Sequence, residues 1–121
     1  MAENLNEQKE ALEVLSGFNS RLVDNMEIAI EELSGNRKED TDKLVKSITD
    51  AVNWEVQVLN STMDLLNKDK MRIEKEAFNA AITEFANALQ QGGDDKLAAA
   101  LKTMLPQFKK LGSAVKEIGL S

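Results

Sequence analysis

The sequence predicts an all-α protein: an antiparallel four-helix bundle whose last helix is kinked at a proline. Three observations lead there. Apolar residues recur every three or four positions along nearly the whole chain, which is the period of one face of an α-helix. One proline and six glycines are all that punctuate 121 residues. That length is also typical of a helical bundle, so residues 1–121 are interpreted as a single domain.

The first helix is expected from about Asn4 to Leu33. Its apolar stripe is interrupted by two polar residues, Gln8 and Asn19. Ser34, Gly35 and Asn36 then supply a typical C-terminal stop. The residues expected on the stripe are Leu5, Leu12, Leu15, Leu22, Met26, Ala29 and Leu33.

The second helix is expected to begin near Asp40 or Thr41, either of which can cap a helix. Residues 41–91 could form one long helix, because residues 67–70 include no glycine or proline. A break is favoured, since the step of five residues from Leu66 to Met71 turns the apolar face by about 140°. Asn67 or Asp69 would then cap a third helix.

The third helix should end at Gly92 and Gly93, and Asp94 or Asp95 should cap the fourth. Pro106 lies inside the last helix but off its apolar stripe, which keeps its phase on both sides. This pattern favours a kink; the alternative is a break with Pro106 in a new first turn. The stripe comprises Leu97, Leu101, Met104, Phe108, Leu111, Val115 and Ile118.

The composition argues against most catalytic chemistry. The chain has no histidine and no cysteine, which are the usual general base and the strongest side-chain nucleophile. No cofactor is expected, and the protein is interpreted as not being an enzyme. The start of the chain does not resemble a signal peptide, and the longest apolar run, residues 97–101, is too short to cross a membrane. A soluble, cytoplasmic protein is expected.

Charge is distributed unevenly along the chain. The net charge of −6 argues against nucleic acid as a partner. Residues 1–36 carry −6, whereas residues 96–121 carry +4. We therefore expect the first helix to lie beside the last, with apolar packing supplying most of the stability because surface ion pairs contribute little.

Two glutamates lie near apolar stripes, Glu55 on the second helix and Glu84 on the third. Together they could bind a cation or share a proton. The favoured interpretation is that each is a boundary residue that reaches water or a lysine. No metal site is predicted, because two carboxylates without histidine bind transition metals poorly.

Four apolar residues lie outside the stripes and are the candidate partner-binding residues: Trp54 on the second helix and Val14, Phe18 and Ile28 on the first. Tryptophan is enriched at interaction hot spots. They could meet another protein or a second copy of the chain. Alternatively, a broad bundle could cover them as ordinary core.

The last helix carries one resemblance. Residues Gly93-Asp94-Asp95-Lys96-Leu97-Ala98 open a helix that leads through a leucine-rich run to Met104-Leu105-Pro106. This stretch is similar to one in small uncharacterised all-helical proteins of Gram-positive bacteria, although Lys102 and Thr103 replace the acidic and aromatic residues expected before the proline. The resemblance implies the helical fold and no activity.

The function expected from these observations is protein–protein interaction without catalysis. An alternative is a small export-type chaperone, similar to flagellar chaperones in size, acidity and helicity, that binds a client helix. A third hypothesis, from a different class, is a carboxylate-lined metal or ligand bundle.

Overall fold

The computed structural model describes the backbone of residues 2–120 and the side chains of residues 7–118. It contains four helices: α1 (Ala2–Leu33), α2 (Thr41–Leu66), α3 (Lys75–Gln91) and α4 (Asp94–Leu120). No strand occurs in residues 2–120. The all-α class is therefore confirmed. Leu5, expected on the first stripe, lies outside the described side chains.

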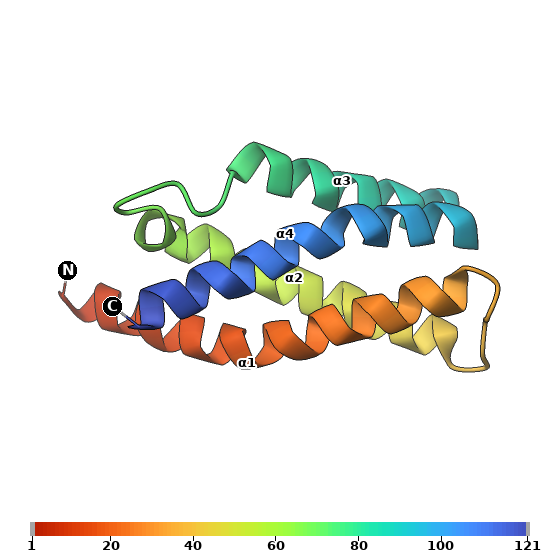
Figure 1. Ribbon diagram of the computed structural model, residues 1–121, viewed down its shortest axis with the longest axis horizontal. Helices are drawn as coiled ribbons and strands as arrows, with labels where there is room; N and C mark the ends of the chain where they lie inside the picture. The colour runs from red at the N-terminus through yellow and green to blue at the C-terminus, as the bar shows by residue number, and fades with distance from the viewer. Residues whose placement is uncertain (1, 121) are drawn as a thin grey trace.

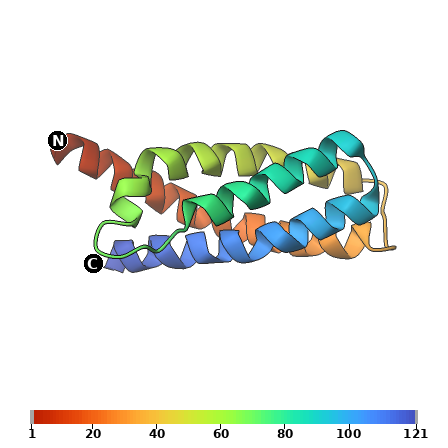
Figure 2. The ribbon, with the colours of Figure 1, turned by 90° about the horizontal axis from the view of Figure 1, so that it is seen from above.

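The helices form an elongated bundle. In Figure 1, α1 and α3 run from left to right, and α2 and α4 run back; the view from above shows the same alternation (Figure 2). α1 packs against α2 and α4, α3 packs against α4, and α2 reaches α4 across the bundle. The acidic first helix therefore lies beside the basic last helix, as its charge predicts.

The apolar stripes form the core. Along α1 every expected position with a described side chain is buried. Along α4 the expected positions are buried except the first and last, Leu97 and Ile118, which are partly buried against the core. The rings of Phe78 on α3 and Phe108 on α4 lie with their centroids 5.0 Å apart, which joins α3 to the rest of the core. The fully buried large side chains include Leu15, Met26, Leu33, Ile48, Leu59, Leu66, Ile73, Leu101, Met104 and Leu111.

The chain breaks between α2 and α3, so residues 41–91 form two helices and the predicted break is confirmed. The details differ from expectation. Met71 does not begin the new stripe: it lies in the link and is 75% exposed, whereas Ile73 is buried. Asn67 ends α2 and does not cap α3. Its Oδ1 accepts hydrogen bonds from the backbone N–H groups of Arg72 and Ile73, each at 2.9 Å.

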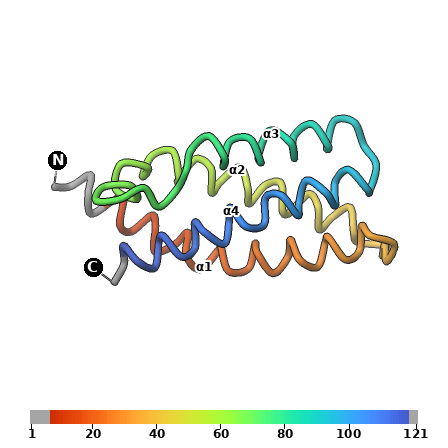
Figure 3. Tube along the Cα trace, turned by 45° about the horizontal axis from the view of Figure 1, so that its top comes forward, coloured from red at the N-terminus to blue at the C-terminus, as the bar shows by residue number. Residues whose placement is uncertain are grey.

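The other two links lie at the opposite end of the bundle from this one (Figure 3). α1 ends where predicted, before Gly35. Neither Asp40 nor Thr41 caps α2 through its side chain; the hydroxyl of Thr41 instead donates to Glu32 at 2.7 Å. Gly92, with φ of 74°, ends α3 as predicted, because this left-handed conformation suits glycine.

α4 is continuous from Asp94 to Leu120 and includes Pro106. The alternative of a break at the proline is therefore wrong. Pro106 is exposed, so its ring takes no place in the core, and the helix loses the one hydrogen bond that a proline cannot donate. Asp94 and Asp95 lie inside the first turn of α4, not at a capping position before it.

Candidate functional site

The structure brings together three of the four candidate partner-binding residues. Phe18 on α1 and Trp54 on α2 meet where these two helices lie side by side, with ring centroids 5.2 Å apart and planes tilted by 51°. Val14 precedes Phe18 by one helical turn on the same face. The exposed fractions of Val14, Phe18 and Trp54 are 51%, 49% and 37%. The bundle therefore does not cover them as ordinary core.

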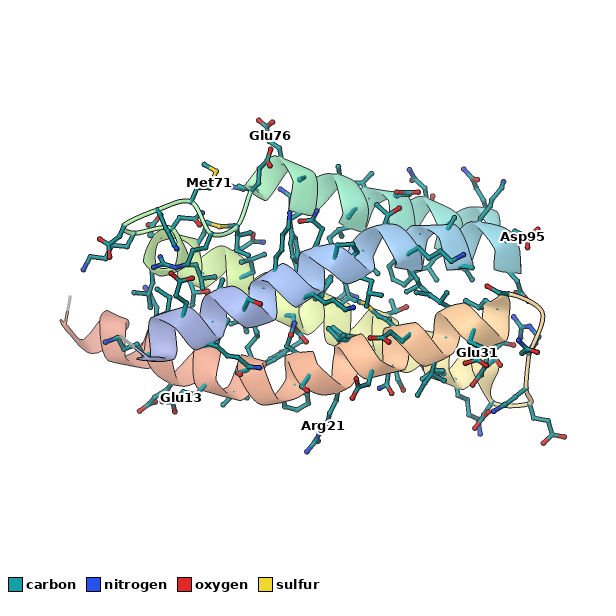
Figure 4. The ribbon with its side chains drawn as sticks, viewed as in Figure 1. Glu13, Arg21, Glu31, Met71, Glu76 and Asp95 are labelled. Atoms are coloured by element: carbon teal, nitrogen blue, oxygen red, sulfur yellow. The ribbon has the colours of Figure 1, made fainter. Side chains whose placement is uncertain are left out.

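Ile28 is also exposed, at 46%. It lies on the outer side of α1, ten residues after Phe18 and so about 15 Å further along the helix axis. Arg21 stands between the two and points away from the bundle (Figure 4). Ile28 therefore extends the exposed face without touching the ring pair.

A depression of about 480 Å³ adjoins the ring pair. Its lining comprises Phe18, Ser47, Asp50, Ala51 and Trp54. The walls are thus two aromatic rings and small side chains, with one carboxylate at the rim. An apolar side chain from a partner would contact the rings here, and a polar group would have Asp50 within reach.

Directly beneath the ring pair lies a buried polar pair. Asn19 follows Phe18, and Glu55 follows Trp54. The side-chain amide of Asn19 donates to Glu55 Oε1 at 3.1 Å and to the carbonyl oxygen of Phe108 at 3.0 Å. This amide therefore connects α1 to both α2 and α4.

Glu55 is fully buried, and its Oε2 has no hydrogen-bond partner. Burial raises the pKa of this carboxyl to about 7, and the hydrogen bond from Asn19 offsets only part of that effect. The expectation that Glu55 is a boundary carboxylate reaching water or lysine is therefore wrong. The helix rotation that exposes Trp54 turns the next residue, about 100° further round, into the interior.

Glu84 does not join Glu55. It is exposed on α3, where it lines a depression between α3 and α4. Within the described part of the chain, no three acidic, cysteine or histidine residues lie close enough to hold a metal ion. The two glutamates therefore do not form a shared carboxylate site.

Gly112 on α4 completes the buried polar cluster. A Cβ atom at this position would collide with Oδ1 of Asn19. The close approach of α4 to Asn19 thus requires a residue without a side chain. The sequence marks Asn19 and Glu55 as polar interruptions of their stripes, but nothing in the local pattern distinguishes Gly112 from any other glycine in a helix.

Two arginines connect the links to α4. Arg37 donates two hydrogen bonds to Asp94, at 2.7 and 2.9 Å, and one to Asp42 at 2.8 Å. These bonds lower the pKa of Asp94. At the other end, Arg72 lies 3.3 Å from Glu117 and donates to the carbonyl of Leu66. Each arginine is ion-paired within the bundle, although Nε of Arg72 is buried without a hydrogen-bond partner. We therefore assign both clusters to the fold.

Within the described residues, no helix is long and apolar enough to cross a membrane. Comparison with curated proteins gives no match, and neither does comparison with solved structures. A family model does match: it covers residues 4–114, which is most of the chain, and it describes a domain of unknown function, DUF8042. The expected kinship with an uncharacterised helical family is thus confirmed. This chain belongs to the DUF8042 family.

Proposed function

We propose that this protein is a non-catalytic interaction module that binds another protein through the α1–α2 face. That face is defined by the exposed residues Glu7, Glu10, Val14, Phe18, Arg21, Ile28, Lys43, Lys46, Asp50, Trp54 and Asp64. The observation that carries the proposal is the ring pair. Phe18 and Trp54 contact each other, yet each leaves more than a third of its surface in water.

Exposed rings of this kind favour recognition. Aromatic residues provide much of the binding energy at interaction hot spots, particularly where small and polar residues surround them. Here Val14 extends the apolar surface, and Arg21 and Asp50 lie one turn from the rings. A contiguous patch of this composition is more informative than single exposed apolar residues, which are common on protein surfaces.

The absence of catalysis is part of the proposal. The chain lacks histidine and cysteine. The carboxyl of Glu55, whose pKa burial raises to about 7, is fully buried, so a substrate has no access to it. The lack of cysteine also fits a reducing compartment, and we place the module in the cytoplasm. The acidic balance disfavours nucleic acid as the partner.

The proposal can be tested by capturing partners from a lysate with the immobilised protein. Phe18→Ser and Trp54→Ser should lose the captured protein. Leu89→Ser is the matched control, because Leu89 on α3 is 37% exposed, like Trp54. All variants should keep a cooperative unfolding transition close to that of the wild type. Loss of binding by the Leu89 variant as well, or retention by both ring variants, would contradict the proposed surface.

A client helix of the kind bound by export-type chaperones is the second candidate occupant, and the depression beside Trp54 is the observation that favours it. A helix bound there would insert one apolar side chain per turn. Hydrogen exchange on the captured protein distinguishes the cases. A client helix would gain protection in one segment only, whereas a folded partner would keep its protection pattern outside the contact.

A further inference from the structure

We infer that the α1–α2 face is self-complementary, so that its partner is a second copy of this chain docked about a two-fold axis at the Phe18–Trp54 pair. This inference deepens the proposed function and rests on it. Charged residues on either side of the two rings are arranged along the face in the way that such a pairing requires.

Three contacts fix the register of α1 against α2. Phe18 meets Trp54, Asn19 meets Glu55, and Glu32 meets Thr41. One residue number rises as the other falls between the first contact and the last, so the two helices run in opposite directions here. Residues before Phe18 on α1 therefore lie at one end of the face, and residues before Trp54 on α2 lie at the other.

The charges follow the same spacing on both helices. Glu10 and Glu7 precede Phe18 by eight and eleven residues, and Lys46 and Lys43 precede Trp54 by the same two intervals. At a rise of 1.5 Å per residue, the nearer member of each pair lies about 12 Å from its ring along the helix axis, and the further member about 16 Å. Because the intervals are equal, the glutamates are turned about the axis of α1 from Phe18 by the same angles as the lysines are turned about the axis of α2 from Trp54.

Among the residues that define the face, one end is therefore acidic and the other basic. The exposed acids of α1 at the basic end, Asp24, Glu27 and Glu31, lie about 120° or more round that helix from Phe18 and so outside the face. Glu7, Glu10, Lys43 and Lys46 are all exposed. Within the described part of the chain, none of the four makes an ion pair or a side-chain hydrogen bond. Asp64, ten residues after Trp54, adds a further acid to the acidic end. These charges are thus available to a partner.

A two-fold axis in the plane of this face, passing through the rings and perpendicular to the line from the glutamate pair to the lysine pair, exchanges its two ends. It lays the acidic end of one copy on the basic end of the other, and it does so twice. The rings of both copies meet at the centre, where Arg21 and Asp50 balance each other in charge. A two-fold interface requires this kind of self-complementary patch, and opposite charges at its rim would orient the encounter.

The size of the face sets the strength of association. From Glu7 to Ile28 it is about 32 Å long, and two helices are about 20 Å wide, which gives on the order of 600 Å² per copy. Stable complexes bury about 800 Å² per partner. We therefore expect a reversible dimer whose population rises with protein concentration and falls with added salt, since salt screens the rim charges.

Charge reversal tests the inference. Glu7→Lys/Glu10→Lys makes both ends of the face basic, and Lys43→Glu/Lys46→Glu makes both ends acidic. Each variant alone should raise the dimer dissociation constant about tenfold or more. An equimolar mixture should associate at least as tightly as the wild type, because a face with two basic ends then meets a face with two acidic ends. Sedimentation velocity from about 10 µM to about 1 mM covers the range of a weak complex.

The matched control for Glu7→Lys/Glu10→Lys is Glu76→Lys/Glu84→Lys, which also replaces two exposed glutamates by lysines and so changes the net charge by the same amount. Both residues are exposed on α3, and Figure 4 shows Glu76 on the far side of the bundle from α1. This control should dimerise like the wild type. A wild type that stays monomeric throughout the range, or a mixture that associates no better than either variant alone, would overturn the inference.

The two proposals fail separately. If the wild type is monomeric but Phe18→Ser and Trp54→Ser still lose a protein captured from the lysate, the second copy is excluded and the interaction module stands. If the ring variants match the Leu89→Ser control in both capture and sedimentation, the proposed function fails as well.

Discussion

At the scale of single residues, the fold changes the chemistry of Glu55 most. Its carboxyl is fully buried, with one hydrogen bond from a neutral amide and one oxygen without a partner. Ionising such a group is costly, because a single hydrogen bond from a neutral amide replaces only part of the hydration that is lost on burial. A raised pKa follows, and with it a dependence of stability on pH.

The first prediction is that the protein becomes less stable between pH 5 and pH 8. The pKa of Glu55 rises from 4.5 to about 7 on folding, so the folded chain holds the proton more tightly than the unfolded chain does. The stability linked to this proton is complete below about pH 4.5 and is lost as the pH rises through 7. The loss is on the order of 3 kcal/mol. Asp94 and Glu117, whose pKa values are lowered by their ion pairs, titrate below this window.

Glu55→Gln supplies the comparison. The glutamine keeps an oxygen that accepts from Asn19 but cannot ionise, so most of the pH dependence should disappear. Urea denaturation of both proteins at pH 5, 6, 7 and 8 measures this. Equal slopes of stability against pH in the two proteins would show that Glu55 is not the group responsible.

Opposite effects are predicted for two glycines. Gly112→Ala should destabilise the protein by about 1–3 kcal/mol, because the added methyl collides with Asn19 and overpacks the interface of α1 and α4. Gly17→Ala should stabilise it by about 0.5–1 kcal/mol, since Gly17 is exposed and nothing lies near its Cβ position. Thermal unfolding of both variants tests the pair. Equal shifts would mean that helix propensity alone decides both positions.

The polar pair shows how far the sequence carries at this scale. Asn19 and Glu55 each interrupt an apolar stripe, so the pattern alone marks them as exceptional. Their contact depends on the register of α1 against α2. The link of residues 34–40 sets this register together with the hydrogen bond from Thr41 to Glu32, the residues on either side of the link. Local periodicity contains no information about register. For that reason the sequence pattern alone groups Glu55 with Glu84, which lies on a different helix and is exposed to water.

At the scale of the elements, helix phase is the reliable signal. The turn of the apolar face after Leu66 predicts the break between α2 and α3, and α1, α2 and α4 begin or end close to the expected residues. The start of α3 is later than expected, because side-chain hydrogen bonds within residues 66–73 hold the link in a non-helical conformation. Asn67 bonds to residues five and six positions away, and Arg72 bonds to Leu66. No propensity rule supplies such contacts, and Met71 stays exposed as a result.

Pro106 gives the prediction for this scale. α4 continues through the proline, which is exposed and leaves the carbonyl of Lys102 without its helical N–H partner. Pro106→Ala would restore that hydrogen bond without opening a cavity, so we expect a gain in stability of about 1–3 kcal/mol. Leu105→Ala, at the neighbouring half-buried position, should reduce stability instead. A loss of stability in Pro106→Ala would indicate that the proline shapes α4 to fit its neighbours.

At the scale of the whole molecule, charge and packing have separate roles. α1 and α4 pack together, yet the ion pair between them, from Lys109 to Glu27, spans 3.9 Å and both side chains are more than half exposed. Pairs of this kind contribute little. The stripes of leucine, methionine and phenylalanine stabilise the contact, and the segregated charge favours this neighbour over another acidic helix.

Because apolar packing and not charge stabilises the bundle, we predict that folding does not depend on a metal ion. The acidic residues that remain exposed are spread over the bundle, and the buried carboxyl of Glu55 faces a neutral amide. Removing divalent cations with EDTA should therefore leave the unfolding midpoint of the wild type unchanged. Treating Glu55→Gln in parallel shows whether any effect of EDTA arises from the buried carboxyl or from the carboxyls on the surface. Three results together would contradict the prediction: EDTA lowers the midpoint of the wild type by more than a few degrees, one divalent ion restores it, and Glu55→Gln does not respond to either treatment. Glu55 would then ligate a metal ion, and the bundle would belong to the carboxylate-lined class.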